Sequence, residues 1–139
     1  MRFENDKDLI REQDAIEIFC GSMGISYEKL SMHDVDYKLT KEDRVAYAEV
    51  KGRNRSIDDA YPLPIAARKV LKLIDKKQVA FIIWDCYDGI IWGKVSDIVG
   101  EAKVGGRKPR DGAYNDIEFM IYYDKQKNLI TIPNYQKIV

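Results

Sequence analysis

The sequence predicts a mixed α/β fold, in which helices flank a sheet of parallel and antiparallel strands. Three observations predict it: an amphipathic helical segment comes first, two extended segments of hairpin spacing follow, and a second helical segment leads into further apolar strands. The expected core order is therefore α-β-β-α-β, not a doubly wound parallel sheet. A chain of 139 residues suits one domain, so we expect residues 1–139 to form a single domain.

The first helix is predicted from residue 6 to about residue 21, with Gly21 and Gly24 ending it. Apolar residues recur along it at three- and four-residue steps: Leu9, Ile16, Phe19 and Met23. Glu12 falls inside this apolar arc. A carboxylate there is costly unless it is paired or bound to a metal, so Glu12 needs an interior partner. That partner is either a plain buried ion pair or a site on the sheet beneath the helix.

Two extended segments follow, at residues 34–39 and 45–51, joined by a polar connection of hairpin length. If the turn is centred between Glu42 and Asp43, counting outward along both strands places Tyr37 opposite Ala48. A bulge would shift this register by one residue.

The same register places Asp36 opposite Glu49, and Lys51 shares the face of Glu49 because alternate strand residues point the same way. Two opposed carboxylates are destabilising unless they are neutralised, and a hard cation such as Mg²⁺ would neutralise them. Asp34 shares the face of Asp36 and replaces it if the register shifts. The alternative is a solvated sheet face on which Lys51 merely compensates the acidic charge.

After a basic loop at residues 52–56, Asp58 or Asp59 can cap a helix that runs to about Lys76 and whose first turn tolerates two prolines. The remaining predicted elements are a hairpin of residues 79–86 and 89–95, a turn or short helix near Asp97, a Gly- and Pro-containing loop at 103–116, and closing strands at 117–123 and 129–132.

Composition limits the classes of function. The 23 basic and 23 acidic residues balance, so any case for a nucleic-acid partner must come from local basic stretches. No apolar run approaches the roughly 20 residues that cross a bilayer. The first residues lack an apolar signal-peptide core, and Cys20 and Cys86 are too few for a disulfide framework or a zinc cluster. We therefore expect an intracellular, cytoplasmic protein with no membrane partner.

The order of these acidic and basic residues resembles the PD-(D/E)xK nuclease superfamily, and within it the small Holliday-junction-resolvase-like and phage-type members. The resemblance covers roughly residues 6–95: a helical Glu, an Asp on one strand, Glu-x-Lys on the next, then a helix and more strands. Val35 stands where the family name has Pro. The resemblance implies a restriction-endonuclease-like sheet with these roles: Glu12, Asp36 and Glu49 as acidic catalytic and metal-site residues, the Val50 carbonyl as a further metal ligand, and Lys51 as the catalytic lysine.

We therefore expect a metal-dependent DNA endonuclease that hydrolyses phosphodiester bonds with Mg²⁺ or Mn²⁺, with junction or branched DNA as a candidate substrate. The resemblance further suggests a homodimer and a phage-encoded protein acting in the host cell. Predicted DNA contacts are Arg53, Arg55, Lys69, Arg107, Arg110 and Tyr114. The alternatives are a non-catalytic nucleic-acid-binding module on the same fold and a small structural or interaction protein.

Overall fold

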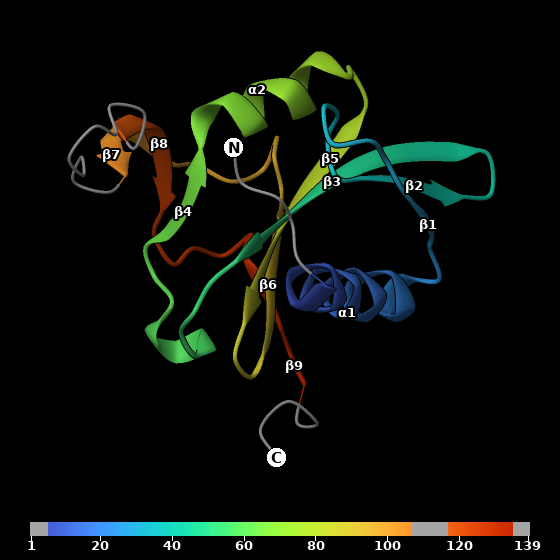
Figure 1. The fold of residues 1–139 in the computed structure, drawn as a ribbon, viewed down its shortest axis with the longest axis horizontal. Helices are drawn as coiled ribbons and strands as arrows, with labels where there is room; N and C mark the ends of the chain where they lie inside the picture. Colours follow the sequence, from blue (N-terminus) through green and yellow to red (C-terminus); the bar gives the residue numbers. More distant parts are fainter. Residues whose placement is uncertain (1–5, 107–116, 135–139) are drawn as a thin grey trace.

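The structure is a computed structural model that describes residues 6–106 and 117–134. A six-stranded sheet forms its centre, with a helix on each face and a second, three-stranded sheet at one side (Figure 1). The central sheet has the strand order β1-β2-β3-β5-β6-β9 and the smaller sheet the order β4-β8-β7.

The first helix and hairpin form where the sequence predicts them. Helix α1 spans Asp6–Met23, and Gly24, at a φ of 65°, ends it in the left-handed conformation that favours glycine. Strands β2 (Tyr37–Lys41) and β3 (Arg44–Gly52) pair antiparallel with Tyr37 opposite Ala48, so the predicted register is confirmed. A short strand not predicted from the sequence, β1 (Ser26–Lys29), pairs with β2.

The second helix begins later than predicted. Asp58 and Asp59 lie in a 3-10 turn, Ile57–Asp59, and residues Leu63–Ala66 form strand β4. Helix α2 covers only Ala67–Asp75. The predicted start was wrong because a residue before proline disfavours helical backbone, whereas an edge strand such as β4 tolerates proline.

The later strands largely follow the pattern of apolar residues. The observed elements are β5 (Val79–Cys86), β6 (Gly89–Lys94), β7 (Glu101–Gly106), β8 (Ile117–Tyr123) and β9 (Ile130–Pro133). The predicted turn near Asp97 is present, with its backbone N–H bonded to the Lys94 carbonyl. The predicted loop at 103–116 is wrong in its first part, because residues 103–106 belong to β7 and pair with β8.

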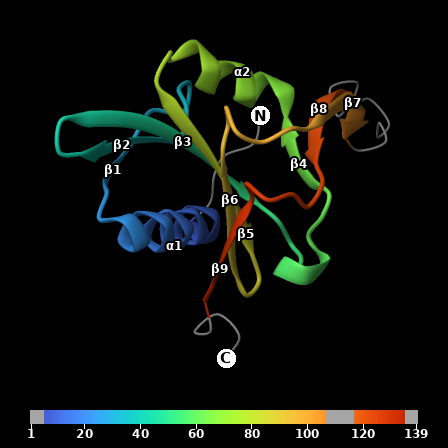
Figure 2. The ribbon, with the colours of Figure 1, turned by 180° about the vertical axis from the view of Figure 1, so that it is seen from behind.

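The central sheet is mixed, as predicted, because β3 and β5 run parallel while its other neighbouring strands run antiparallel. Helix α1 packs on one face, where Ile16 and Phe19 meet Ile83. Helix α2 and the smaller sheet cover the other face, where Leu73 packs in the same cluster as Trp84 (Figures 1 and 2).

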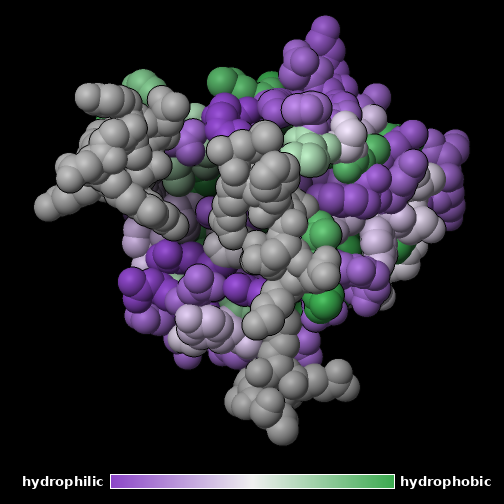
Figure 3. Space-filling view, in the orientation of Figure 1, coloured by the Kyte–Doolittle hydropathy of each residue, from purple (hydrophilic) through white to green (hydrophobic). Residues whose placement is uncertain are grey.

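The face of the molecule in Figure 3 is largely hydrophilic, with hydrophobic residues in separate small areas. In the part of the chain that the structure describes, no helix is long and apolar enough to cross a membrane. Cys20 and Cys86 are both buried free thiols.

Candidate active site

Glu49 is a buried carboxylate on the central strand β3, and only 2% of it is exposed. Alternation along β3 sends Ala48 into the cluster under α1, whereas Tyr47 packs against the cluster under α2. Glu49 therefore faces α2. A buried carboxylate at such a position needs a charge or hydrogen-bond partner.

Asp36 lies directly before β2 and meets Glu49 at the end of the hairpin. Its Oδ2 atom accepts a hydrogen bond of 2.8 Å from the backbone N–H of Val50. Burial, followed by the charge of Asp36 and a side-chain hydrogen bond to it, raises the pKa of Glu49 to about 8. The predicted Asp36–Glu49 juxtaposition is therefore present, and without a cation the pair holds a proton at neutral pH.

Two lysines belong to the surroundings of Glu49. Lys69 on α2 places its Nζ 3.5 Å from Glu49 Oε2, and its charge acts to lower the pKa of Glu49. Lys51 is half-buried and follows on the same face of β3, about 7 Å farther along the strand. The site therefore combines the carboxylates of Asp36 and Glu49 with two ammonium groups. That of Lys69 approaches from α2, and that of Lys51 lies farther along β3.

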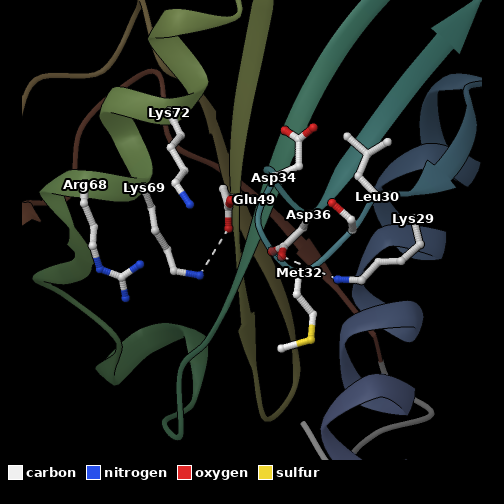
Figure 4. A pocket seen from close by; sticks show the side chains of 10 residues that line it. Lys29, Leu30, Met32, Asp34, Asp36, Glu49, Arg68, Lys69 and Lys72 are labelled. Carbon is white, nitrogen blue, oxygen red and sulfur yellow. Dashed lines mark hydrogen bonds and ion pairs between the residues drawn. The ribbon is translucent and has the colours of Figure 1, made fainter. Parts of the chain in front are cut away.

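A cavity opens over Asp36, Glu49 and Lys69 (Figure 4), and Lys51 is not among the residues that line it. Its lining consists of an acidic floor of Asp34, Asp36 and Glu49, a basic wall of Arg68, Lys69 and Lys72 on α2, and a facing wall formed by Lys29, Leu30, Ser31 and Met32. Acidic and basic groups that share one cavity suit a ligand carrying both a cation and an anion, such as a metal-bound phosphate.

Glu12 lies near the acidic pair but does not line the cavity. Its side chain is 11% exposed, and its Oε1 accepts a 2.8 Å ion-pair hydrogen bond from Lys29 Nζ. The same ammonium lies 3.5 Å from Asp36 Oδ1. Glu12 thus has the charge partner that the sequence required, although this partner is the exposed Lys29 and not an interior group, and Lys29 connects it to Asp36. Leu9, by contrast, is 39% exposed and lies outside the buried stripe assigned to it.

Asp34 has a different partner. Its Oδ1 lies 2.7 Å from Lys76 Nζ, and this hydrogen bond is the largest of the influences that lower the pKa of Asp34. Its carboxylate also accepts a hydrogen bond from the Val35 N–H. The geometry therefore brings Asp36, and not Asp34, against Glu49.

The predicted DNA contacts divide into several groups. Arg53 donates from Nε to the Ala60 carbonyl at 2.8 Å, and burial lowers its pKa. Arg55 is exposed and pairs with Asp59 at 3.2 Å. Arg107, Arg110 and Tyr114 lie outside the described residues.

The donor set fits a hard divalent cation. Among the described residues, no three acidic, cysteine or histidine side chains gather closely enough to form a complete cage. Mg²⁺ commonly binds through only one or two carboxylates together with water and substrate phosphate, which is what Asp36 and Glu49 can offer. Burial, and then the charge of Asp36, raises the pKa of Glu49, and a cation bound between the two carboxylates would favour their ionised forms.

The residues predicted from the sequence did not include Lys29, Arg68 or Lys72, which all line the cavity. Lys29 sits on the short strand β1, which has no apolar alternation. Its role depends on the approach of α1 to the sheet, and no local pattern in the sequence encodes that approach. The exposed Met32 was likewise missed, because it lies in the irregular segment between β1 and β2.

Comparisons with known proteins bear on the fold and on the family of the chain. A search of solved structures finds the 1.6 Å structure of Hjc from Archaeoglobus fulgidus, a Holliday junction resolvase from an archaeal hyperthermophile. The TM-score is 0.53 at 12% identity, covering 84% of this chain and 88% of that one. This likeness confirms the restriction-endonuclease-like fold predicted from the sequence.

A search of curated proteins finds no match. A family model described as "Phage putative PDDEXK endonuclease" matches residues 1–128, which is most of the chain. The chain therefore belongs to this PD-(D/E)xK endonuclease family of phages.

Proposed function

We propose that the chain is a metal-dependent DNA endonuclease that hydrolyses phosphodiester bonds with Mg²⁺ or Mn²⁺ as cofactor. Its active site would be the one that contains Asp36 and Glu49. The observation that carries this proposal is the buried Glu49, which shares one cavity with Asp36 and has the Lys69 ammonium 3.5 Å from its Oε2. Membership of an endonuclease family supports it. Asp36, Glu49 and the Val50 carbonyl would hold the cation.

The side chains of this site divide the chemistry among them. A bound Mg²⁺ or Mn²⁺ would neutralise phosphate charge and lower the pKa of water. Lys51 would orient the attacking water and stabilise negative charge that develops on the phosphate. Lys69 would favour the ionised form of Glu49, and the basic wall of α2 would bind the phosphate backbone next to the scissile bond.

For the substrate, we propose duplex DNA with a branch or junction. Hjc, whose fold this chain shares, is by its title a Holliday junction resolvase. Two symmetric cuts at a four-way junction call for two active sites, so a homodimer accompanies this proposal. We further propose that the protein acts in the cytoplasm of a phage-infected cell, in line with its family.

The test is cleavage of labelled linear, flap and four-way-junction DNA with Mg²⁺, with Mn²⁺ or with chelator. We expect metal-dependent cleavage of at least one substrate. Glu49→Gln and Lys51→Met should each lower the rate at least 100-fold while DNA is still bound. Glu42→Gln, in the exposed β2–β3 turn, is the matched control and should cleave normally.

Two results would support the alternatives instead. DNA binding without cleavage under any metal condition would indicate a non-catalytic nucleic-acid-binding module. Absence of both DNA binding and Mn²⁺ binding would indicate a structural or interaction protein.

A further inference from the structure

Lys29 lies between two carboxylates that come from different parts of the fold. It is the last residue of strand β1, at the edge of the central sheet. Its Nζ is 2.8 Å from Glu12 Oε1 on helix α1 and 3.5 Å from Asp36 Oδ1, directly before β2. One ammonium therefore joins the helix to the acidic pair in the cavity.

The aromatic ring of Tyr37 also favours a cation at this point. Lys29 Nζ lies 5.0 Å from the centroid of the ring, within the range of a cation–π contact. Tyr37 is itself buried, whereas the Lys29 side chain is 39% exposed, so Lys29 is held by its contacts and not by burial. Fixed contacts to two carboxylates and a ring distinguish Lys29 from a solvated surface lysine, which would keep its ammonium in water.

The charges of the site divide into two parts around Asp36. On one side Glu49 faces Asp36 and Lys69, inside the cavity. On the other side Glu12 faces Lys29, and Glu12 does not line the cavity. A divalent cation on the Glu12 side would have to displace the ammonium or accept its repulsion at close range.

We propose that the Lys29 ammonium takes the place of a second metal ion. It neutralises the negative charges of Glu12 and Asp36 where these carboxylates approach each other, so the chain binds one divalent cation, held by Asp36 and Glu49. This inference rests on the proposed function, because it assumes that the cavity binds such a cation. It gives Glu12 a different role from the ligand role that family resemblance implies. Glu12 acts through Lys29 and is a positioning residue.

Mn²⁺ titrations without DNA test this inference, with free Mn²⁺ measured by electron paramagnetic resonance at pH 8.5. We expect one Mn²⁺ per wild-type chain. Lys29→Met keeps the apolar stem and removes the charge, so Glu12 and Asp36 become available and the number should rise to two. Lys29→Met combined with Glu12→Gln should return it to one.

Two further variants serve as controls. Lys29→Arg keeps the charge and should bind one Mn²⁺. Lys38→Met on the adjacent strand β2, where Lys38 stands opposite Glu28 in the strand register, should also bind one. Glu12→Gln alone tests the inference if Lys29→Met fails to fold, and it should change the Mn²⁺ dissociation constant less than threefold.

The outcomes separate the inference from the proposed function. Two Mn²⁺ ions in the wild type, one in folded Lys29→Met, or a tenfold loss of affinity in Glu12→Gln would each overturn the role of Lys29 and leave a metal-dependent nuclease intact. A wild-type chain that binds no Mn²⁺ would overturn both proposals.

Discussion

Glu49 and Asp36 meet at the end of the β2–β3 hairpin, and burial together with the Asp36 charge raises the pKa of Glu49 to about 8. The pair is therefore protonated once near neutral pH when no cation is present. A cation that binds there must displace this proton, so stability and metal affinity both depend on pH.

The metal-free protein should lose stability as pH rises from about 5 to about 8. The pKa of Glu49 in the folded protein lies above its ordinary value of 4.5. Protonation of Glu49 therefore stabilises the folded protein fully below pH 4.5, and this stabilisation is lost as the pH rises past about 8. The slope is at most about 1.4 kcal/mol per pH unit. Urea unfolding with chelator at pH 5.5, 7 and 8.5 measures it. Glu49→Gln should remove this part of the slope, and equal slopes in the two proteins would contradict the prediction.

Asp36→Asn and Asp34→Asn should differ in metal binding. Asp36 lies against Glu49, so its replacement should weaken Mn²⁺ binding at least tenfold by calorimetry. Asp34 instead pairs with Lys76 at 2.7 Å, and both side chains are partly exposed. Asp34→Asn should cost only about 0.2–1 kcal/mol of stability and leave Mn²⁺ affinity within twofold. A larger loss of Mn²⁺ affinity in Asp34→Asn would indicate that Asp34, and not Asp36, is the metal ligand.

The hairpin and its carboxylate pair were predictable because their causes are local. A two-residue turn between Lys41 and Arg44 fixes the register, and strand alternation then fixes which side chains share a face. Glu12 was predictable as a paired carboxylate because a helical arc with one acidic residue needs a partner. These inferences require only neighbours in sequence and the periods of helix and strand.

The features that the sequence did not predict depend on tertiary packing. Strand β4 forms because it pairs with β8, more than fifty residues later in the chain, and this pairing overrides the helical appearance of the segment. The Lys29 bridge needs α1 and β2 on either side of it. Lys69 reaches Glu49 only because α2 begins at Ala67 and packs over β3.

Removing the Lys69 ammonium should move the pH dependence of Mn²⁺ binding upward. Lys69 lowers the pKa of Glu49, so Lys69→Met should raise that pKa above the wild-type value of about 8. Affinity would then reach its plateau at a higher pH. Lys72→Met, on the same helix, is the control, because Lys72 reaches the His33 carbonyl at 3.4 Å. Calorimetry between pH 6.5 and 9.5 measures both variants, and identical profiles would show that Lys69 does not act on Glu49.

Arg53 and Arg55 were predicted together as DNA contacts, but their surroundings predict different effects of substitution. Arg53 donates to the carbonyls of Ala60 and Pro62, at 2.8 and 3.4 Å, so Arg53→Met should lower the free energy of unfolding by about 1–3 kcal/mol. The Arg55 side chain forms an exposed pair with Asp59, and Arg55→Met should cost less than about 1 kcal/mol.

For DNA binding, we expect the larger effect from Arg55→Met and the smaller one from Arg53→Met. Arg55→Met should reduce the salt dependence of DNA binding, measured as the slope of log K against log salt, by about 0.9, the value for one lost phosphate contact. Arg53→Met should leave that slope unchanged in the folded fraction, because its guanidinium is held by backbone carbonyls. A reduced slope in Arg53→Met with normal stability would show instead that Arg53 releases these carbonyls and binds phosphate.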